Sequence, residues 1–308
     1  MKKQSQLGVV FAQGSCLLLW ASAFPGIRHG LTAFTPDQLS LLRFLVGSAL
    51  LLLIALIFRI RLPEPKDIPA LLLFGASGFT VYHAALNYGE VTVSSGVASL
   101  FVSTTPIFAA LLALLVYRER LGLRGWAGSL LGFVGVLISS MGTGQPFQWN
   151  NGIVLILVAS FSESLYFAFQ KPYVEKYGFL AFTAYSVWGG TLFMLYALPG
   201  LGEAILQAPA SVSLTVLYLG IFPTVLAYLA LAYVTARVGA SEATSSLYLT
   251  PALAFGIAWI WLGEVPSLLS IAGGVVTLGG VLAATTGGAP AGDAEAGTRK
   301  GKIGHGSN

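Results

Sequence analysis

Charged side chains are scarce in this sequence. Only 9% of its 308 residues are Asp, Glu, Lys or Arg, whereas 56% are hydrophobic. A soluble domain carries roughly a quarter charged residues, so this chain has too few charges to cover a surface in water. The single cysteine, Cys16, excludes an internal disulfide, and it lies in an apolar run where we expect a small packing residue. The composition therefore indicates a membrane protein.

Long apolar runs recur from residue 8 to residue 286. A helix needs about 20 apolar residues to cross the hydrocarbon core of a bilayer, and backbone groups in lipid must pair within the protein. The alternation of period two that marks a membrane β-barrel is missing from the sequence. We therefore predict an all-α integral membrane protein with ten transmembrane helices near residues 8–29, 36–58, 67–88, 94–116, 124–141, 151–173, 180–199, 212–235, 241–262 and 267–286.

The two ends of the chain differ in character. The N-terminal segment imitates a secretory signal peptide, with two lysines, an apolar run and the small residues of the stretch 21–23. We interpret it as a transmembrane helix, because its apolar run contains Gln13 and continues past that stretch. The segment 287–308 consists mainly of glycine, alanine and charged residues, and it is predicted to be disordered.

The positions of Lys and Arg predict the orientation in the membrane. Cytoplasmic loops carry an excess of these residues. If the N-terminus is cytoplasmic, 14 of the 16 Lys and Arg fall in cytoplasmic segments, and the other two are Arg28 and Arg43. The net charge of +4 then reflects topology rather than nucleic-acid binding, and both termini are predicted to be cytoplasmic. The outer loops carry the acidic residues Asp37, Glu90, Glu203 and Glu264.

The two halves of the sequence repeat at an offset of 145 residues. Pro106 corresponds to Pro251, and a glutamate follows each proline by 13 residues, at Glu119 and Glu264. Further matched pairs are Gly75 with Gly220, Tyr88 with Tyr233, Gly128 with Gly273, and Gly135 with Gly280. We predict a first five-helix repeat over 1–145 and a second over 146–286, which is inverted because five is an odd number. Inverted repeats are typical of secondary transporters, whose sites lie between the halves near the midplane.

These residues carry a resemblance to the EamA-type transporters of the drug/metabolite transporter superfamily. The sequence is similar to them at residues 20–24 (WASAF), at Pro36 and Arg43, from Thr105 to Glu119, and from Thr250 to Glu264. Within that family it looks most similar to the YddG-type exporters of aromatic amino acids, which also handle paraquat. The resemblance implies a ten-helix fold, a central cavity lined by spans 1, 3, 4, 6, 8 and 9, and export across the inner membrane.

Two ionisable residues within predicted spans are candidates for substrate binding, since such residues are costly in a bilayer. Glu163 lies in the sixth span with Tyr166 and Phe167 at helical spacing, and its carboxylate could meet a substrate ammonium or a proton. The alternative is a neutral, hydrogen-bonded packing residue. His83 lies in the third span, and its titration range suits proton coupling. The alternative is a histidine that bonds a neighbour. Its aromatic neighbours are Phe79 and Tyr82.

Other polar and aromatic residues within the spans are weaker candidates. For Arg43 we favour a structural role over that of a counter-ion for a substrate carboxylate. Hydroxyls and small residues in membranes serve close helix packing as readily as ligand binding. Pro106 and Pro251 interrupt matched helices and could be hinges, while Gly128, Gly132 and the glycines of the tenth span predict packing between spans five and ten. The additional candidates for substrate binding are Gln13, Ser99, Phe101, Tyr228 and Tyr248.

The predicted function is that of a secondary transporter that exports small amphiphilic metabolites, namely aromatic or hydrophobic amino acids, by alternating access. The alternatives are export of other metabolites or cationic drugs, or a channel or scramblase. An enzyme is not expected, because the sequence lacks a zinc motif, an aspartate cluster and a nucleotide-binding loop. We predict no metal or cofactor and no nucleic-acid partner, only a small-molecule substrate and the lipid bilayer; the sequence does not indicate an oligomeric state.

Overall fold

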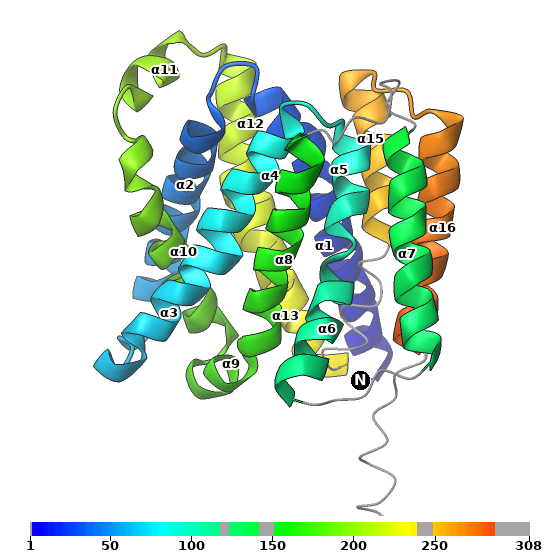
Figure 1. The fold of residues 1–308 in the computed structure, drawn as a ribbon. Helices are drawn as coiled ribbons and strands as arrows, with labels where there is room; N and C mark the ends of the chain where they lie inside the picture. The colour runs from blue at the N-terminus through cyan, green and yellow to red at the C-terminus, as the bar shows by residue number, and fades with distance from the viewer. Residues whose placement is uncertain (1, 118–122, 142–150, 239–248, 287–308) are drawn as a thin grey trace, which may run out of the picture.

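In the computed structural model of the chain, residues 2–117, 123–141, 151–238 and 249–286 are described, and they form helices without any strand (Figure 1). These helices make ten groups that run across the molecule, and the protein is an all-α membrane protein built from two five-helix repeats. The predicted tail at 287–308 and the predicted boundary between the repeats, at 145 and 146, lie outside the described residues. Glu119 and Tyr248 lie outside them as well.

The first repeat begins with α1 (Lys2–Gly30). Thr35 then caps α2 (Pro36–Ile57) through a capping box with Gln38, which explains why that helix begins where it does. The third span is continuous and contains η1 (Pro65–Asp67), α3 (Ile68–Gly75), the π-helical segment η2 (Ala76–Val81) and α4 (Tyr82–Glu90). The repeat ends with α5 (Ser95–Val102), α6 (Thr105–Tyr117) and α7 (Leu123–Met141).

The second repeat begins with α8 (Asn151–Phe169), which ends four residues before the predicted end of the sixth span, and continues in the short helix α9 (Lys171–Tyr177). The short helix η3 (Leu195–Ala197) lies within the predicted seventh span, whereas the short helix α11 (Leu201–Gln207) was not predicted. The remaining helices are α10 (Phe179–Met194), α12 (Ala210–Ile221), the π-helical segment η4 (Phe222–Leu226), α13 (Ala227–Val238), α15 (Thr250–Leu262) and α16 (Leu268–Thr286).

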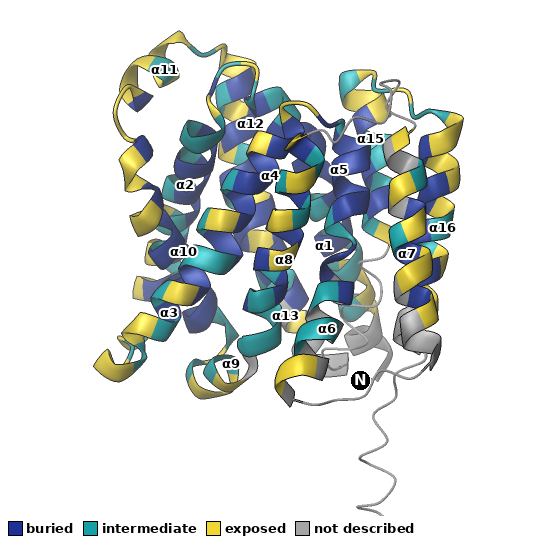
Figure 2. Cartoon of the chain, viewed as in Figure 1, coloured by how far each residue is buried: buried dark blue, intermediate teal, exposed yellow. Residues whose placement is uncertain are grey.

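The outer surface of the helix bundle is apolar, as a protein in lipid requires. Among the described residues, six helices are long and apolar enough to cross a membrane, and two shorter apolar helices cover Thr250–Leu262 and Leu268–Gly280. Large apolar side chains such as Leu56 and Ile57 of α2 and Ile260 of α15 are exposed on the outer surface, while buried residues face the interior (Figure 2). The backbone polar groups are paired within helices, which a bilayer demands.

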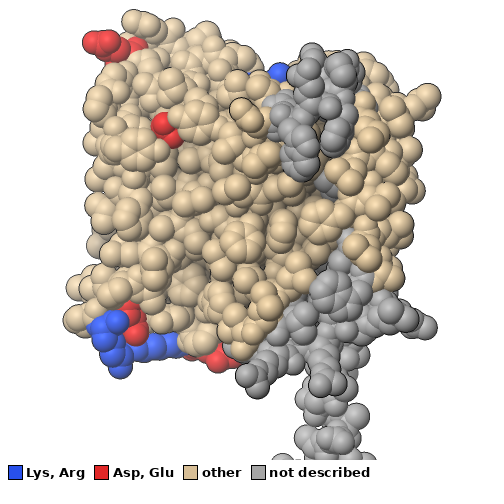
Figure 3. All heavy atoms as spheres, viewed as in Figure 1, with Lys and Arg blue, Asp and Glu red and all other residues tan. Residues whose placement is uncertain are grey.

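The two ends of the bundle differ in charge. Most Lys and Arg atoms visible in Figure 3 gather at one end, which we call the basic end and which carries Arg59, Arg61, Lys66 and Lys176. The N-terminus lies at this end of the bundle, as does α9 (Figure 1). The opposite end, which we call the acidic end, carries Asp37, Glu90, Glu203 and Glu264.

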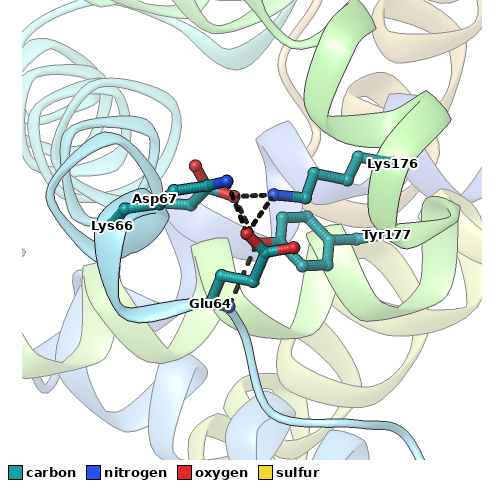
Figure 4. A network of polar contacts seen from close by, with 5 residues as sticks. All are labelled: Glu64, Lys66, Asp67, Lys176 and Tyr177. Carbon is teal, nitrogen blue, oxygen red and sulfur yellow. Dashed lines mark hydrogen bonds and ion pairs between the residues drawn. The ribbon is translucent and has the colours of Figure 1, made fainter.

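A polar network joins the two repeats at the basic end (Figure 4). Lys176 of α9 lies 2.9 Å from Glu64 and 2.5 Å from Asp67, and Lys66 lies 2.8 Å from Glu64. Tyr177 donates a hydrogen bond to Asp67 and accepts one of 3.1 Å from the Glu64 backbone N–H. Hydrogen bonds from Lys66 and Lys176 hold the pKa of the Glu64 carboxyl below its ordinary value.

The helix boundaries reproduce the offset of 145 residues that the sequence predicts. Helix α6 covers 105–117 and α15 covers 250–262, while α7 covers 123–141 and α16 covers 268–286. Pro106 and Pro251 are each the second residue of their helix, where the missing N–H is tolerated. In the first repeat the helical conformation is interrupted by a turn at Ser103 and Thr104, just before Pro106. This proline therefore lies at the start of a new helix and does not kink the middle of one.

Both repeats also carry a π-helical segment at matched positions, in the third and eighth spans. η2 ends at Val81 and η4 ends at Leu226, again 145 residues apart. In each segment a threonine hydroxyl donates to the carbonyl five residues earlier, Thr80 to Gly75 at 3.4 Å and Thr224 to Leu219 at 2.8 Å. π-helical turns are rare and are frequent at functional sites, so the duplication preserved an unusual backbone feature.

The fifth helices of the two repeats, α7 and α16, pack side by side (Figure 1). A Cβ on Gly280 would lie 2.2 Å from the Gly132 nitrogen, and one on Gly135 would lie 2.3 Å from the Thr277 nitrogen. The predicted packing of spans five and ten through glycines is thus confirmed. Gly279, however, faces open space, so not every glycine of the tenth span serves this contact.

Candidate functional site

The candidate site is a cluster of aromatic rings around Phe79, where helices of both repeats meet. The fully buried Phe79 ring lies 5.6 Å from Tyr166 of α8, 5.8 Å from Tyr228 of α13, and 6.0 Å from both Phe44 of α2 and His83 of α4. We call these five residues the aromatic cluster. It brings together four of the predicted site residues, Phe79, His83, Tyr166 and Tyr228.

His83 is enclosed by rings on several sides. Its ring centre lies 4.6 Å from that of Tyr82 and 4.9 Å from that of Phe44, both edge-on, and it stacks on Phe79. The Nδ1 atom lies 3.1 Å from the Phe79 carbonyl oxygen. Because a carbonyl only accepts hydrogen bonds, Nδ1 carries the hydrogen and Nε2 is the acceptor nitrogen of the neutral ring. The histidine therefore presents a hydrogen-bond acceptor within an aromatic environment.

Tyr228 is contacted by Trp20 of the first span. Its ring lies 5.1 Å from that of Trp20, edge to face. The Trp20 indole N–H donates a hydrogen bond of 3.1 Å to the carbonyl of Pro223, which lies in η4. Trp20 thus connects α1 of the first repeat with the π-helical segment of the second repeat, and its ring extends the aromatic cluster.

Tyr166 is placed by a glycine in the opposite π-helical segment. Its side chain is buried and its ring also contacts those of Phe74, Phe167 and Phe182. A Cβ on Gly78 would lie only 2.4 Å from the Tyr166 ring. Only glycine lets η2 approach this ring so closely, so the sequence at Gly78 fixes the position of Tyr166 in the aromatic cluster.

Glu163 lies on α8 one turn before Tyr166 and is half-buried. Its Oε2 accepts a hydrogen bond of 3.0 Å from the hydroxyl of Thr105. Thr105 begins α6, so the carboxylate lies at a helix N-terminus, where the exposed N–H groups favour negative charge. Glu163 therefore faces the break in the fourth span, whereas Tyr166 faces the aromatic cluster.

Arg43 connects the two repeats through a buried hydrogen bond. Its guanidinium is buried in α2, and Nε donates a hydrogen bond of 2.6 Å to the hydroxyl of Thr224 in η4. A structural role, which we favoured from the sequence, agrees with this contact. No ion-pair partner of Arg43 is found among the described residues.

Two predicted site residues of the fourth span lie elsewhere. The Ser99 hydroxyl donates to the Gly96 carbonyl of its own helix at 2.6 Å, and Phe101 is buried in a separate apolar core. The Phe101 carbonyl accepts a hydrogen bond of 3.1 Å from Ser160 of α8. The Ser99 hydroxyl bond therefore stays within α5, whereas the Phe101 contact joins α5 to α8. Tyr82 packs in the same core as Phe101 while its ring contacts His83.

The remaining predicted residues are spread along the bundle. Gln13 is half-buried on α1, and Phe167 is partly buried beside Tyr166. Pro106 and Pro251 begin α6 and α15, as described above. Tyr248 lies outside the described residues.

Two members of the site were missed by sequence reasoning. Phe44 directly follows Arg43, and the resemblance gave the second span no part in the cavity. Trp20 belongs to the segment at residues 20–24 that carries the resemblance, which was a usable signal. Within the described part of the chain, no group of three His, Cys, Asp or Glu side chains is arranged to hold a metal ion.

Comparisons with known proteins agree on one family. The family model described as EamA-like transporter family matches residues 6–141 and again residues 150–286. The chain is 53% identical to the "Uncharacterized transporter YdfC" of Bacillus subtilis over 91% of this chain and 92% of that protein. It is 34% identical to a "Probable terminal-alkyne amino-acid exporter" of Streptantibioticus cattleyicolor over 89% and 92%.

More distant relatives extend this picture. The chain is 27% identical to the "Uncharacterized inner membrane transporter YedA" of Escherichia coli K12, over 80% of this chain and 79% of that protein. One crystal structure, at 20% identity, shares the fold with a TM-score of 0.64 over 90% of this chain and 96% of that chain. The protein is a membrane transporter and not an enzyme, and the chain belongs to the EamA-like transporter family.

Proposed function

We propose that this protein exports aromatic or hydrophobic amino acids across the inner membrane by alternating access. The observation that carries the proposal is the aromatic cluster at the junction of the two repeats. Secondary transporters with inverted repeats bind their substrates at such a junction. A relative 34% identical is named as an amino-acid exporter, which supports the same substrate class.

The chemistry of the cluster fits an amphiphilic substrate. Aromatic rings favour edge-to-face or offset contact with another ring, so Phe79, Tyr166 and Tyr228 suit an aromatic or branched apolar side chain. Glu163 lies outside the aromatic cluster, one turn before Tyr166 on α8, and would supply the negative charge for an α-ammonium group. A phosphorylated substrate would require several buried cations, and Arg43 is already bonded to Thr224.

The interruption of the fourth span suits a hinge. The helix of the fourth span is interrupted by a turn at Ser103 and Thr104. Helix α6 then begins at Thr105, whose hydroxyl donates a hydrogen bond to Glu163. A substrate ammonium that binds Glu163 would compete with Thr105 for the carboxylate. Substrate binding would then release the N-terminus of α6, which connects occupancy of the site to movement of the fourth span.

Orientation and location form part of the proposal. The basic end would face the cytoplasm, since positive residues are retained on that side, and both termini would lie there. A relative named as an inner membrane transporter supports the same membrane.

The test is flux in proteoliposomes with a panel of radiolabelled amino acids. We expect saturable uptake of tryptophan or phenylalanine, with acceleration by the same amino acid inside the vesicle. Glu163→Gln and His83→Ala should lower the flux at least several-fold. The control is Glu203→Gln, which alters an exposed carboxylate in α11 and should leave flux unchanged.

The outcomes separate the alternatives. If the protein transports cationic drugs but none of the amino acids tested, cationic drugs replace amino acids as the proposed substrate class. Flux without saturation or counterflow would indicate a channel or scramblase. Unchanged kinetics in both variants would assign Glu163 and His83 to packing.

A further inference from the structure

A buried carboxyl group at the acidic end has no hydrogen-bond partner. Glu90 is the last residue of α4, its side chain is 0% exposed, and neither carboxyl oxygen has a partner among the described residues. One turn earlier on the same helix face lies Asn87, which is 1% exposed. The mechanism proposed above uses neither residue.

The amide of Asn87 is fixed so that only its oxygen remains unpaired. Its nitrogen donates to the Pro36 carbonyl at 3.1 Å and to the Ser40 hydroxyl at 2.8 Å. Both partners lie on α2, and both hydrogens of the amide nitrogen are thereby used. Asn87 Oδ1 is left without a partner among the described residues.

Three acceptor oxygens are therefore buried at this place without a donor. A buried polar group without a hydrogen bond is costly, and a buried, unpaired carboxylate is far more so. A single proton lowers both costs, because it neutralises Glu90 and turns one of its oxygens into a donor. We propose that Glu90 is a proton-binding site of the acidic end, where its neutral carboxyl donates a hydrogen bond to Asn87 Oδ1.

Arg28 already has an acidic partner other than Glu90, whereas the buried Arg43 has no ion-pair partner among the described residues. Arg28 of α1 lies 3.8 Å from Glu264, and it donates hydrogen bonds to the backbone carbonyls of Glu90 and Val91. Arg43 bonds Thr224. The ionisable side chains on the elements around Glu90 are Arg28 and His29 of α1, Asp37 and Arg43 of α2, Glu163 of α8, and Glu264 after α15.

Contacts of Arg28 and Glu264 connect the two repeats at the acidic end. Glu264 of the second repeat accepts a hydrogen bond of 3.0 Å from the Ser95 N–H, which begins α5, and it attracts Arg28 at the end of α1. Opening this end must separate Arg28 from Glu264. Arg28 is already bonded to the Glu90 carbonyl, so it would then be the cation available to an ionised Glu90.

The proton is thus linked to the conformation. When the acidic end is closed, Glu90 is protonated and Arg28 is paired with Glu264. With this end open, Glu90 loses the proton to the adjoining solution and pairs with Arg28. A higher pH on that side therefore favours the open acidic end.

Infrared spectroscopy of the purified protein tests the proton directly. We expect the carbonyl stretch of a protonated carboxylic acid at neutral pH, its loss in Glu90→Gln, and its retention in Glu203→Gln, which changes an exposed acid at the same end. A band that Glu90→Gln leaves unchanged overturns the proposal. So does the absence of any such band in the wild-type protein, a result that needs no variant.

A metal cation is the competing occupant, since oxygen ligands suit hard cations. Replacing choline chloride by sodium chloride should leave the band unchanged. Loss of the band on adding sodium would assign the three oxygens to a cation and overturn the proposal.

A second experiment tests whether deprotonation of Glu90 is linked to opening of the acidic end. This experiment rests on the proposed function, whereas the infrared experiment does not. Val93, 1% exposed just after Glu90, is replaced by cysteine and labelled with an impermeant maleimide. Labelling, normalised to the denatured protein, should rise several-fold with pH in Val93→Cys and stay low and flat in the double variant with Glu90→Gln. A rate in Val93→Cys that does not depend on pH refutes the link.

Discussion

The contact between α7 and α16 permits a sharp test of the packing, because two adjacent glycines of α16 differ in their surroundings. A Cβ on Gly280 would lie 2.2 Å from the Gly132 nitrogen, 2.6 Å from the Gly128 carbonyl oxygen and 2.7 Å from the Gly132 Cα. A Cβ on Gly279 would meet nothing within 4 Å. Gly280→Ala and Gly279→Ala therefore add the same methyl group to the same helix in opposite environments.

The expected cost follows from the atoms involved. The closest approach is about 1.2 Å short of the 3.4 Å at which ordinary contact begins, and every close atom belongs to backbone. No side chain can rotate away, so the two helices must separate. Overpacking costs about 1–3 kcal/mol, while alanine in place of a helical glycine gains about 0.5–1 kcal/mol.

We therefore expect Gly280→Ala to lower the free energy of unfolding by about 1–2 kcal/mol, and Gly279→Ala to raise it by up to about 1 kcal/mol. Both can be measured by reversible unfolding in mixed micelles, followed by tryptophan fluorescence. The difference between the two variants is the informative quantity, since both share any effect on the unfolded chain. Equal stabilities would refute the close approach of α7 and α16.

Two further predictions concern the contacts between the repeats. Thr224→Val removes the acceptor of the buried Arg43 Nε and should lower the free energy of unfolding by about 1–3 kcal/mol, whereas the exposed Thr32→Val should change it by less than about 0.5 kcal/mol; equal effects would contradict the contact. At the basic end, Lys66 and Lys176 lower the pKa of Glu64, so their stabilisation is present above the unfolded pKa and is lost as pH falls through the folded pKa. Lys176→Gln should thus be less stable than wild type at neutral pH, and unfolding curves should converge in acid; a difference independent of pH would contradict the assignment.

Much of the fold could be predicted from the sequence, because apolar runs and paired motifs report directly on spans and duplication. The offset read from Pro106 and Pro251 recurs in the helix boundaries. The π-helical segments could not be predicted, since their residues carry no pattern that distinguishes a π turn from an α turn. The helix of the fourth span is interrupted at Ser103 and Thr104 and not at Pro106 itself, because a proline fits the first turn of a new helix.

The site was predictable only in part, for a different reason. Residues one turn apart on one helix, such as Phe79 and His83, were grouped correctly because helical geometry fixes their common face. Phe44 and Trp20 reach the same rings from helices far away in sequence, and their approach depends on packing. Glu163 and Tyr166 share a helix, yet they contact different neighbours, which spacing alone does not reveal.

The duplicated glycines indicate where movement between the repeats can occur. A Cβ on Gly75 would lie 2.6 Å from the Gly190 nitrogen, and one on its counterpart Gly220 would lie 2.9 Å from the Arg43 carbonyl oxygen. Backbones in such contact cannot slide past each other without separating, so the interfaces of α3 with α10 and of α12 with α2 act as a fixed frame. In the proposed transport cycle we therefore expect the interrupted fourth span to move against this frame.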